Sequence, residues 1–135
     1  MNIEYIKDNG MDIAVVSSDG KVITDVQSAL DLAMTVKYET GAANLVLDKG
    51  LICEDFFILS TGVAGEILQK FINYQVRAAI YGDYSRYTSK PLKDFMYESN
   101  RGKDIYFQPT VSLAIDKLSG CTKSKKKEGT MNDNL

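Results

Sequence analysis

Leu45-Val46-Leu47-Asp48 and the segment that follows it carry the clearest signal of the fold class. Three consecutive apolar residues closed by a carboxylate are typical of a strand that is covered on both faces, as in parallel sheets. After a loop, apolar residues recur at the spacing of one helix face, namely Val63, Ala64, Ile67, Leu68, Phe71 and Ile72. A buried strand followed by an amphipathic helix predicts one unit of a parallel α/β sheet.

The same pattern repeats towards the carboxyl end of the chain. Apolar-rich runs and helix-face spacings predict strands at residues 76–81 and 105–107, and helices at residues 89–102 and 109–120. Pro91 fits a helix start, because a first helical turn does not need the missing N–H. Gly102 and Gly120 mark the ends of these two helices.

Towards the amino end, the sequence predicts a β-hairpin and then a helix. Residues 3–7 and 11–16 are rich in β-forming side chains, and Asn9-Gly10 lies between them. This dipeptide is the strongest short-range hairpin signal, because both residues tolerate a positive φ. Thr24 then fits the N-cap of a capping box, with Gln27 at the third helical position.

The predicted order of elements is β-β-α-β-α-β-α-β-α. Strands that alternate with helices imply right-handed crossovers and a mostly parallel sheet, to which the N-terminal hairpin adds antiparallel pairing. The fold class is therefore α/β, a mostly parallel mixed sheet with helices packed on it. We expect a single domain over residues 1–119 and a disordered, Lys-rich tail over residues 120–135, because the tail has almost no apolar residues.

The composition excludes several kinds of chemistry. The chain of 135 residues contains no histidine, so it cannot form a Ser-His-Asp triad, a Cys-His pair or a His-metal site by itself. A net charge of −2, from 16 basic and 18 acidic side chains, argues against general binding of duplex DNA. Glu54 and Asp55 lie near Asp48, but without metal-ligand spacing the simpler interpretation is a solvated loop. We predict no cofactor and no metal site.

The sequence favours a cytoplasmic protein. Cys53 and Cys121 are far apart and form no C-x-x-C motif, which fits free thiols in a reducing compartment. The chain opens without the positive segment and apolar run of a secretory signal. Its longest apolar stretches are far shorter than the ~20 residues that span a bilayer.

The first candidate site is Ser60-Thr61-Gly62, at the start of the helix predicted over residues 63–72. A hydroxyl at a helix N-terminus can accept from free backbone N–H groups. A phosphate there would meet those donors and the positive end of the helix dipole. The segment is therefore a candidate phospho-switch or anion contact. The alternative is a plain N-cap in which the glycine allows close packing.

The second candidate site follows the strand predicted over residues 76–81. It lies at the carboxyl end of that strand, where open α/β sheets usually bind ligands. Tyrosine with arginine is typical of interface hot spots and of stacking on nucleotides. The residues of this candidate binding surface are Asp83, Tyr84, Ser85, Arg86, Tyr87, Ser89 and Lys90. Interleaved acidic residues favour a protein partner over a single-stranded nucleic acid. The alternative is a solvated, tyrosine-rich loop.

The order of elements resembles the STAS fold of bacterial anti-sigma-factor antagonists and transporter tails. Leu45-Val46-Leu47-Asp48 stands for the family's strand, and Ser60-Thr61-Gly62-Val63-Ala64-Gly65 for its turn and helix start. Leu59 stands where that family has an aspartate. In STAS regulators, a partner kinase phosphorylates the first hydroxyl residue of this turn. The resemblance implies that role for Ser60, with Thr61 beside it.

A closer resemblance covers roughly residues 1–118. Its motifs are residues 61–71, Gly82-Asp83-Tyr84-Ser85 and residues 92–102. Together they look like the small bacterial family of domain of unknown function 4180, which has no established activity. This resemblance implies the fold class and a cytoplasmic bacterial origin rather than a reaction.

Two functional hypotheses remain from the sequence. The first is a non-catalytic regulatory or protein-interaction module, with Ser60 and Thr61 as its switch and residues 84–90, with the helix that follows them, as its contact surface. The second is a binding protein or enzyme for an anionic small molecule or nucleotide, in which Arg86, Lys90 and the 60–62 segment face one pocket. A homo-oligomer that uses exposed tyrosines is a third arrangement. Neither membrane nor nucleic acid is expected as a partner.

Overall fold

The computed structural model describes residues 1–120 and confirms the predicted order of elements. The strands are β1 (Asn2–Asp8), β2 (Met11–Ser17), β3 (Asn44–Asp48), β4 (Arg77–Tyr81) and β5 (Ile105–Gln108). The helices are α1 (Val26–Thr40), α2 (Val63–Asn73), α3 (Lys90–Arg101) and α4 (Val111–Ser119). The predicted tail lies outside the described residues, apart from Gly120, which ends α4 in a left-handed conformation.

The five strands lie in the sheet in the order in which they occur in the chain, β1-β2-β3-β4-β5. β1 and β2 are antiparallel, and every later pair is parallel. Asn9 and Gly10 join the first two strands with φ values of 52° and 79°, as expected for the predicted Asn-Gly hairpin. The parallel strands follow one another in a single direction, without a reversal of strand order.

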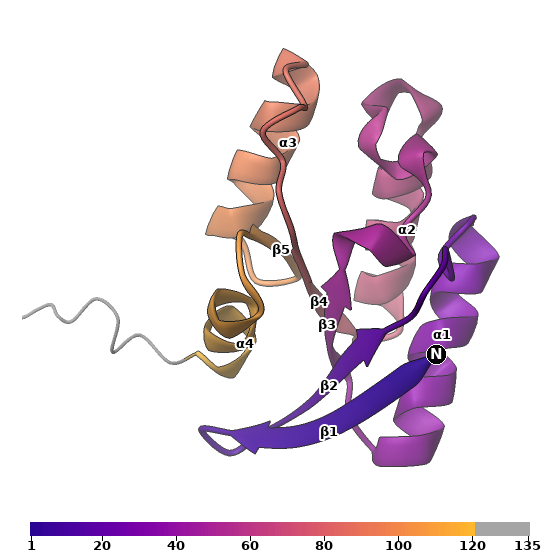
Figure 1. The fold of residues 1–135 in the computed structure, drawn as a ribbon, viewed down its shortest axis with the longest axis vertical. Helices are drawn as coiled ribbons and strands as arrows, with labels where there is room; N and C mark the ends of the chain where they lie inside the picture. The colour runs from indigo at the N-terminus through magenta and orange to yellow at the C-terminus, as the bar shows by residue number, and fades with distance from the viewer. Residues whose placement is uncertain (121–135) are drawn as a thin grey trace, which may run out of the picture.

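The helices form one layer on each face of the sheet. Right-handed crossovers that all step in the same direction place their helices on the same face. Side chains of α1, α2 and α3 accordingly share one large hydrophobic core with the sheet. α4 follows the last strand and packs on the opposite face, over a smaller core that includes Val46, Ala79 and Tyr106 (Figure 1).

The central strand β3 is buried on both faces, as its apolar run predicts. Leu45 and Leu47 belong to the large core, and Val46 belongs to the core under α4. These three side chains are at most 1% exposed. Side chains alternate across a strand, so one continuous apolar run fills both layers.

The capping residues of α1 and α2 differ from those predicted, although α2 begins at Val63 as expected. The N-cap of α1 is Asp25 rather than Thr24, and Ser28 rather than Gln27 completes the capping box. The Asp25 carboxylate accepts from the Ser28 N–H at 2.8 Å, and Ser28 Oγ accepts from the Asp25 N–H at 3.0 Å. The N-cap of α2 is Gly62, which offers no side-chain cap. α3 and α4 begin where expected, with Ser89 and Thr110 as their N-caps.

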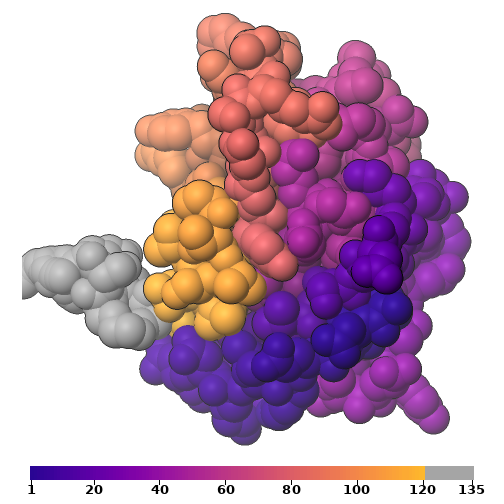
Figure 2. Space-filling model, in the orientation of Figure 1, coloured from indigo at the N-terminus to yellow at the C-terminus, as the bar shows by residue number. Residues whose placement is uncertain are grey.

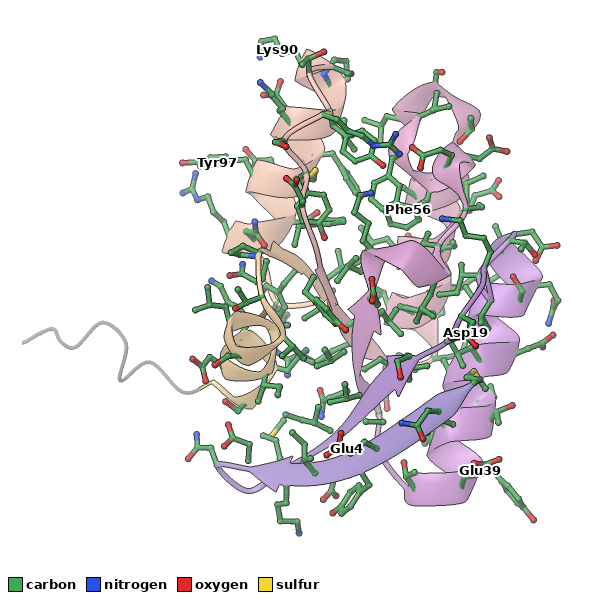
Figure 3. The ribbon with its side chains drawn as sticks, in the orientation of Figure 1. Glu4, Asp19, Glu39, Phe56, Lys90 and Tyr97 are labelled. Carbon is green, nitrogen blue, oxygen red and sulfur yellow. The ribbon has the colours of Figure 1, made fainter. Side chains whose placement is uncertain are left out.

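The connection from β3 to α2 is more ordered than a loop. It contains the 3-10 helices η1 (Lys49–Leu51), η2 (Glu54–Phe57) and η3 (Leu59–Thr61). Leu51, Phe56 and Phe57 point into the large core. Figure 3 shows Phe56 inside the molecule, whereas Lys90 lies at its outer tip. The core is therefore completed by this connection as well as by the helices. Among residues 1–120, no helix is both long enough and apolar enough to cross a membrane.

Candidate functional site

Both candidate segments lie at the end of the sheet where the parallel strands finish. β3 ends at Asp48 and β4 ends at Tyr81, and these two residues are paired in register. Residues 49–62 follow β3 and residues 82–89 follow β4. Both connections therefore leave the sheet at the carboxyl ends of its parallel strands, towards the top of the molecule (Figure 1). Figure 2 shows the second connection as a strip of surface beside the residues that follow β3.

Asp48 organises the strand ends. Its Oδ1 accepts from the Gly50 N–H at 2.8 Å, which fixes the start of η1. Burial raises the pKa of the Tyr81 phenol, and the charge and hydrogen bond of Asp48 raise it further. The carboxylate therefore contacts the connection after β3 and the last residue of β4.

Gly82 lets the two connections touch. A Cβ at this position would lie 2.8 Å from Lys49 Cβ, which is too close for any side chain. The φ of Gly82 is 154°, which L-residues rarely adopt. The absence of a side chain at Gly82, directly after β4, therefore lets Lys49 pack against the second connection.

Glu54, Arg86 and Tyr87 form a closed polar network across the two connections. Arg86 Nη2 donates to Glu54 Oε1 at 2.6 Å and to the Tyr87 hydroxyl at 3.1 Å. The Tyr87 hydroxyl donates to Glu54 Oε2 at 2.9 Å. Tyr87 and then Glu54 raise the pKa of the Arg86 guanidinium. The arginine predicted to face an anion already has a carboxylate from its own chain.

Aromatic rings support this network from below. The Phe57 and Tyr87 rings stack, with centroids 5.1 Å apart and planes at 22°. Lys49 Nζ lies over both rings, 5.4 Å from the Phe57 centroid and 4.9 Å from the Tyr87 centroid. Tyr84 lies deeper and its hydroxyl donates to the Ile80 carbonyl at 2.7 Å, while burial raises its pKa strongly. The predicted tyrosines therefore divide into an anchor, Tyr84, and a partly exposed ring, Tyr87.

Asp83 and Ser85 shape the turn that precedes Arg86. Asp83 Oδ1 accepts from the Ser85 N–H at 2.9 Å. This backbone hydrogen bond is the main cause of a lowered pKa for Asp83, and the charge of Lys49 contributes. Asp83 is thus a turn-forming residue held in its ionised form.

Ser60 and Thr61 differ in their surroundings. Thr61 Oγ1 donates towards the carbonyls of Asp55 and Ile58, at 2.7 and 2.9 Å, and accepts from the Val63 N–H at 3.2 Å. Ser60 is exposed. The Thr61 hydroxyl therefore holds the end of η3, and Ser60 presents its hydroxyl to the surface.

An apolar groove brings the two candidate segments together. It has a volume of about 420 Å³ and is lined by Phe57, Ile58, Leu59, Ser60, Ser89 and Pro91. Ile58 remains 50% exposed although its neighbours Phe56 and Phe57 are buried. The groove thus joins η3 to the start of α3.

Lys90 does not join the groove lining. Its Nζ pairs with Asp94 Oδ2 at 2.7 Å, one turn further along α3. The predicted meeting of Arg86, Lys90 and the 60–62 segment around one anion is therefore not what the contacts show. Instead, Ser60 and Ser89 both line the apolar groove. Arg86 pairs with Glu54, and Lys90 pairs with Asp94.

Comparison with protein families identifies the chain. A family model described as "Domain of unknown function (DUF4180)" matches residues 8–118. The chain belongs to this family. No curated protein and no solved structure matches this DUF4180 domain.

Sequence reasoning missed Lys49 and Phe57 and treated Glu54 as a solvated carboxylate. All three lie on the connection after β3 and contact the connection after β4, Lys49 and Phe57 through Tyr87 and Glu54 through Arg86. The available signal was topological, because connections that follow neighbouring parallel strands leave the sheet side by side. An acidic residue on one such connection and a basic residue on the next, such as Glu54 and Arg86, can then be predicted to form an ion pair.

The polar groups of the DUF4180 site are suited to holding its two connections together. Within residues 1–120, no three His, Cys, Asp or Glu side chains lie close enough to hold a metal ion. The Glu54 carboxylate accepts two hydrogen bonds and so is committed to Arg86 and Tyr87. What the site offers to another molecule is the groove, the exposed Ile58 and the hydroxyl of Ser60.

Proposed function

We propose that this DUF4180 domain is a non-catalytic, cytoplasmic protein-interaction module with a regulatory role. Its contact surface is the groove between η3 and the start of α3, together with residues 83–90. The observation that carries the proposal is the convergence of both candidate segments on an apolar groove whose Ile58 is 50% exposed. Exposed apolar patches mark interaction sites, and tyrosine and arginine, which occur in residues 83–90, are enriched in interface hot spots.

The strand order supports binding of a protein rather than of a small molecule. Open α/β sheets bind small ligands in a crevice where the strand order reverses. The parallel strands β2, β3, β4 and β5 follow one another without such a reversal. The internal pairing of Arg86 with Glu54 and of Lys90 with Asp94 further reduces the attraction for a free anion.

Ser60 is the residue at which we propose regulation. Its hydroxyl lies in the groove lining and is exposed, whereas the Thr61 hydroxyl already contacts three backbone groups. The N-terminus of α3 lies across the groove and has no acidic residue in its first turn. A phosphate on Ser60 would therefore face the positive end of a helix and add about −1.5 to −2 charges to an apolar surface. The resemblance to STAS regulators supports the same position.

The test compares two matched surface substitutions in a capture experiment from cell lysate. Ile58→Glu places a charge in the groove, and Ile72→Glu places the same charge on α2, where Ile72 is 40% exposed. We expect Ile58→Glu to reduce capture of the partner at least tenfold and Ile72→Glu to leave it unchanged. If both variants capture the same proteins as the wild-type chain, the groove is not the contact surface.

Two further measurements separate the proposal from its alternatives. Incubation with lysate and ATP, followed by mass spectrometry, is expected to place a phosphate on Ser60, and Ser60→Ala is expected to abolish it. A thermal-shift screen with nucleotides and phosphorylated metabolites is expected to show no stabilisation. A ligand at a hundred times its dissociation constant would stabilise the folded state by about 2.7 kcal/mol, and such a shift would favour the small-molecule function.

A further inference from the structure

The two edge strands of the sheet, β5 and β1, differ in whether another part of the chain covers them. At the β5 edge, Asn100 of α3 covers the strand, because its Oδ1 accepts from the Phe107 N–H at 2.7 Å and from Gln108 Nε2 at 3.2 Å. At the other edge lies β1, with seven residues. Within residues 1–120, no segment pairs with the outer side of β1, which runs along the margin of the molecule in Figure 1. An uncovered edge is a template for another strand.

The hairpin register identifies the backbone groups that face outward. Asp8 and Met11 are paired on either side of the Asn9-Gly10 turn, and a turn of this kind is closed by a hydrogen bond between those two residues. Hydrogen-bonded and non-bonded pairs alternate along an antiparallel ladder. The amide groups of Ile3, Tyr5 and Lys7 therefore point away from β2.

Asp12 keeps the side chains of two of these residues away from the free edge. Its Oδ1 accepts from the Tyr5 hydroxyl at 2.5 Å and lies 3.5 Å from Lys7 Nζ. Asp12 belongs to β2, so both side chains lean inward across the hairpin. A lysine on an edge strand usually discourages pairing with another strand, but here Lys7 forms an ion pair with Asp12 of the same hairpin.

We propose that β1 pairs antiparallel with β1 of a second copy of this chain, around a two-fold axis at Tyr5. Such an axis keeps the faces of the two sheets aligned, so that Tyr5 lies opposite the partner's Tyr5. Ile3 then lies opposite the partner's Lys7, and Glu4 lies opposite the partner's Ile6. All seven residues of β1 are paired, and the two sheets become one.

The charges of β1 and the number of residues that can pair disfavour the other symmetric registers. An axis at Glu4 or at Lys7 places that residue opposite itself, which is repulsive. An axis at Ile6 places Glu4 opposite the partner's Asp8, which is also repulsive. An axis at Ile3 leaves Ile6, Lys7 and Asp8 unpaired. The Tyr5 register alone pairs the whole strand without opposing like charges, and this self-complementarity favours a second copy over an unrelated peptide.

The first test measures the mass of the full chain by analytical ultracentrifugation over a range of concentrations. We expect the wild-type chain to reach twice its 15.0 kDa mass. Tyr5→Pro removes an amide that faces outward, which an edge strand tolerates, and is expected to give a monomer. Tyr5→Val keeps the amide and is expected to remain a dimer. A wild-type chain that stays at 15.0 kDa, or a Tyr5→Pro variant that still dimerises, would overturn the proposal.

A second test does not depend on the folding of the proline variant. It uses a chain with Cys53→Ser and Cys121→Ser, into which one cysteine is placed on β1. Tyr5→Cys puts two cysteines opposite each other with Cα atoms about 5.5 Å apart, within reach of a disulfide. Lys7→Cys separates them by about four residues along the strand, or about 14 Å, which is too far. We expect a cross-linked dimer from the first variant alone. Cross-linking of both variants, or of neither, would contradict the Tyr5 register.

Discussion

At the scale of single residues, Gly82 decides how closely the two connections of the site approach. Gly82→Ala places a Cβ 2.8 Å from Lys49 Cβ in a conformation that L-residues rarely adopt. We expect the free energy of unfolding to fall by about 1–3 kcal/mol, the usual cost of overpacking. Chemical denaturation followed by circular dichroism measures this change.

Gly65→Ala is the matched control for this substitution. Gly65 lies in α2, and a Cβ there would meet nothing within 4 Å. Because alanine favours a helix over glycine, the same measurement is expected to show a gain of about 0.5–1 kcal/mol. Equal effects of the two substitutions would show that the contact with Lys49 does not constrain the site.

The residues of the site were only partly predictable from the sequence. Asp83, Tyr84 and Arg86 could be placed because they directly follow a strand whose apolar pattern is local. Glu54 could not be paired with Arg86, because these residues are 32 positions apart and meet only after the parallel strands have aligned. Lys90 pairs with Asp94, which lies one turn further along α3, and this carboxylate competes with any external anion for the lysine.

At the scale of elements, η2 acts as part of the core although it lies in a connection. Phe56 is 1% exposed, and its ring lies 4.9 Å from that of Phe57 and 6.2 Å from that of Phe107, measured between centroids. We expect Phe56→Ala to lower the free energy of unfolding by about 3–5 kcal/mol, because it leaves a large cavity. Urea denaturation monitored by circular dichroism measures the loss.

Ile58→Ala is the control for this substitution, because it truncates an apolar side chain of the same connection that is 50% exposed. Surface truncations of this kind usually change stability by less than about 0.5 kcal/mol. A Phe56→Ala variant as stable as the control would show that η2 contributes little to the core.

The elements were predictable wherever their signals were local. The hairpin, the buried strand β3 and the helices α3 and α4 follow from a turn dipeptide, apolar runs and helix-face spacings. The connection from β3 to α2 was not predictable in detail, because short 3-10 helices have no strong periodicity. At the start of α1, Thr24 and Asp25 are both good capping residues. Asp25 is the N-cap because it and Ser28 exchange side-chain to backbone hydrogen bonds.

At the scale of the whole molecule, carboxyl groups and phenols define a pH range of greatest stability. Hydrogen bonds lower the pKa of Asp12, Asp25 and Asp83 below 3.8 in the folded chain. Below about pH 4 the unfolded chain therefore binds more protons, and stability falls as the pH drops through the folded pKa values. Burial raises the pKa of Tyr84, so stability also falls as the pH rises above about 10.

Denaturation experiments from pH 2 to pH 11 test this expectation, with Asp25→Asn as the diagnostic variant. Asparagine is as good an N-cap as aspartate but does not titrate. The variant is therefore expected to lose less stability than the wild-type chain between pH 4 and pH 2, and to match its decline above pH 10. Parallel curves in the acid range would show that Asp25 is not coupled to folding.

The order of the sheet also determines how the chain can assemble. Every strand lies beside the strand that precedes it in the sequence, so no gap has to be kept open for a later segment. A chain that emerges from the ribosome amino end first can add each strand to an edge that already exists. The last helix, α4, then joins the finished sheet, where Arg77 Nη1 donates to the Leu118 carbonyl at 3.0 Å. The direction of synthesis and the direction of sheet growth are the same in this protein.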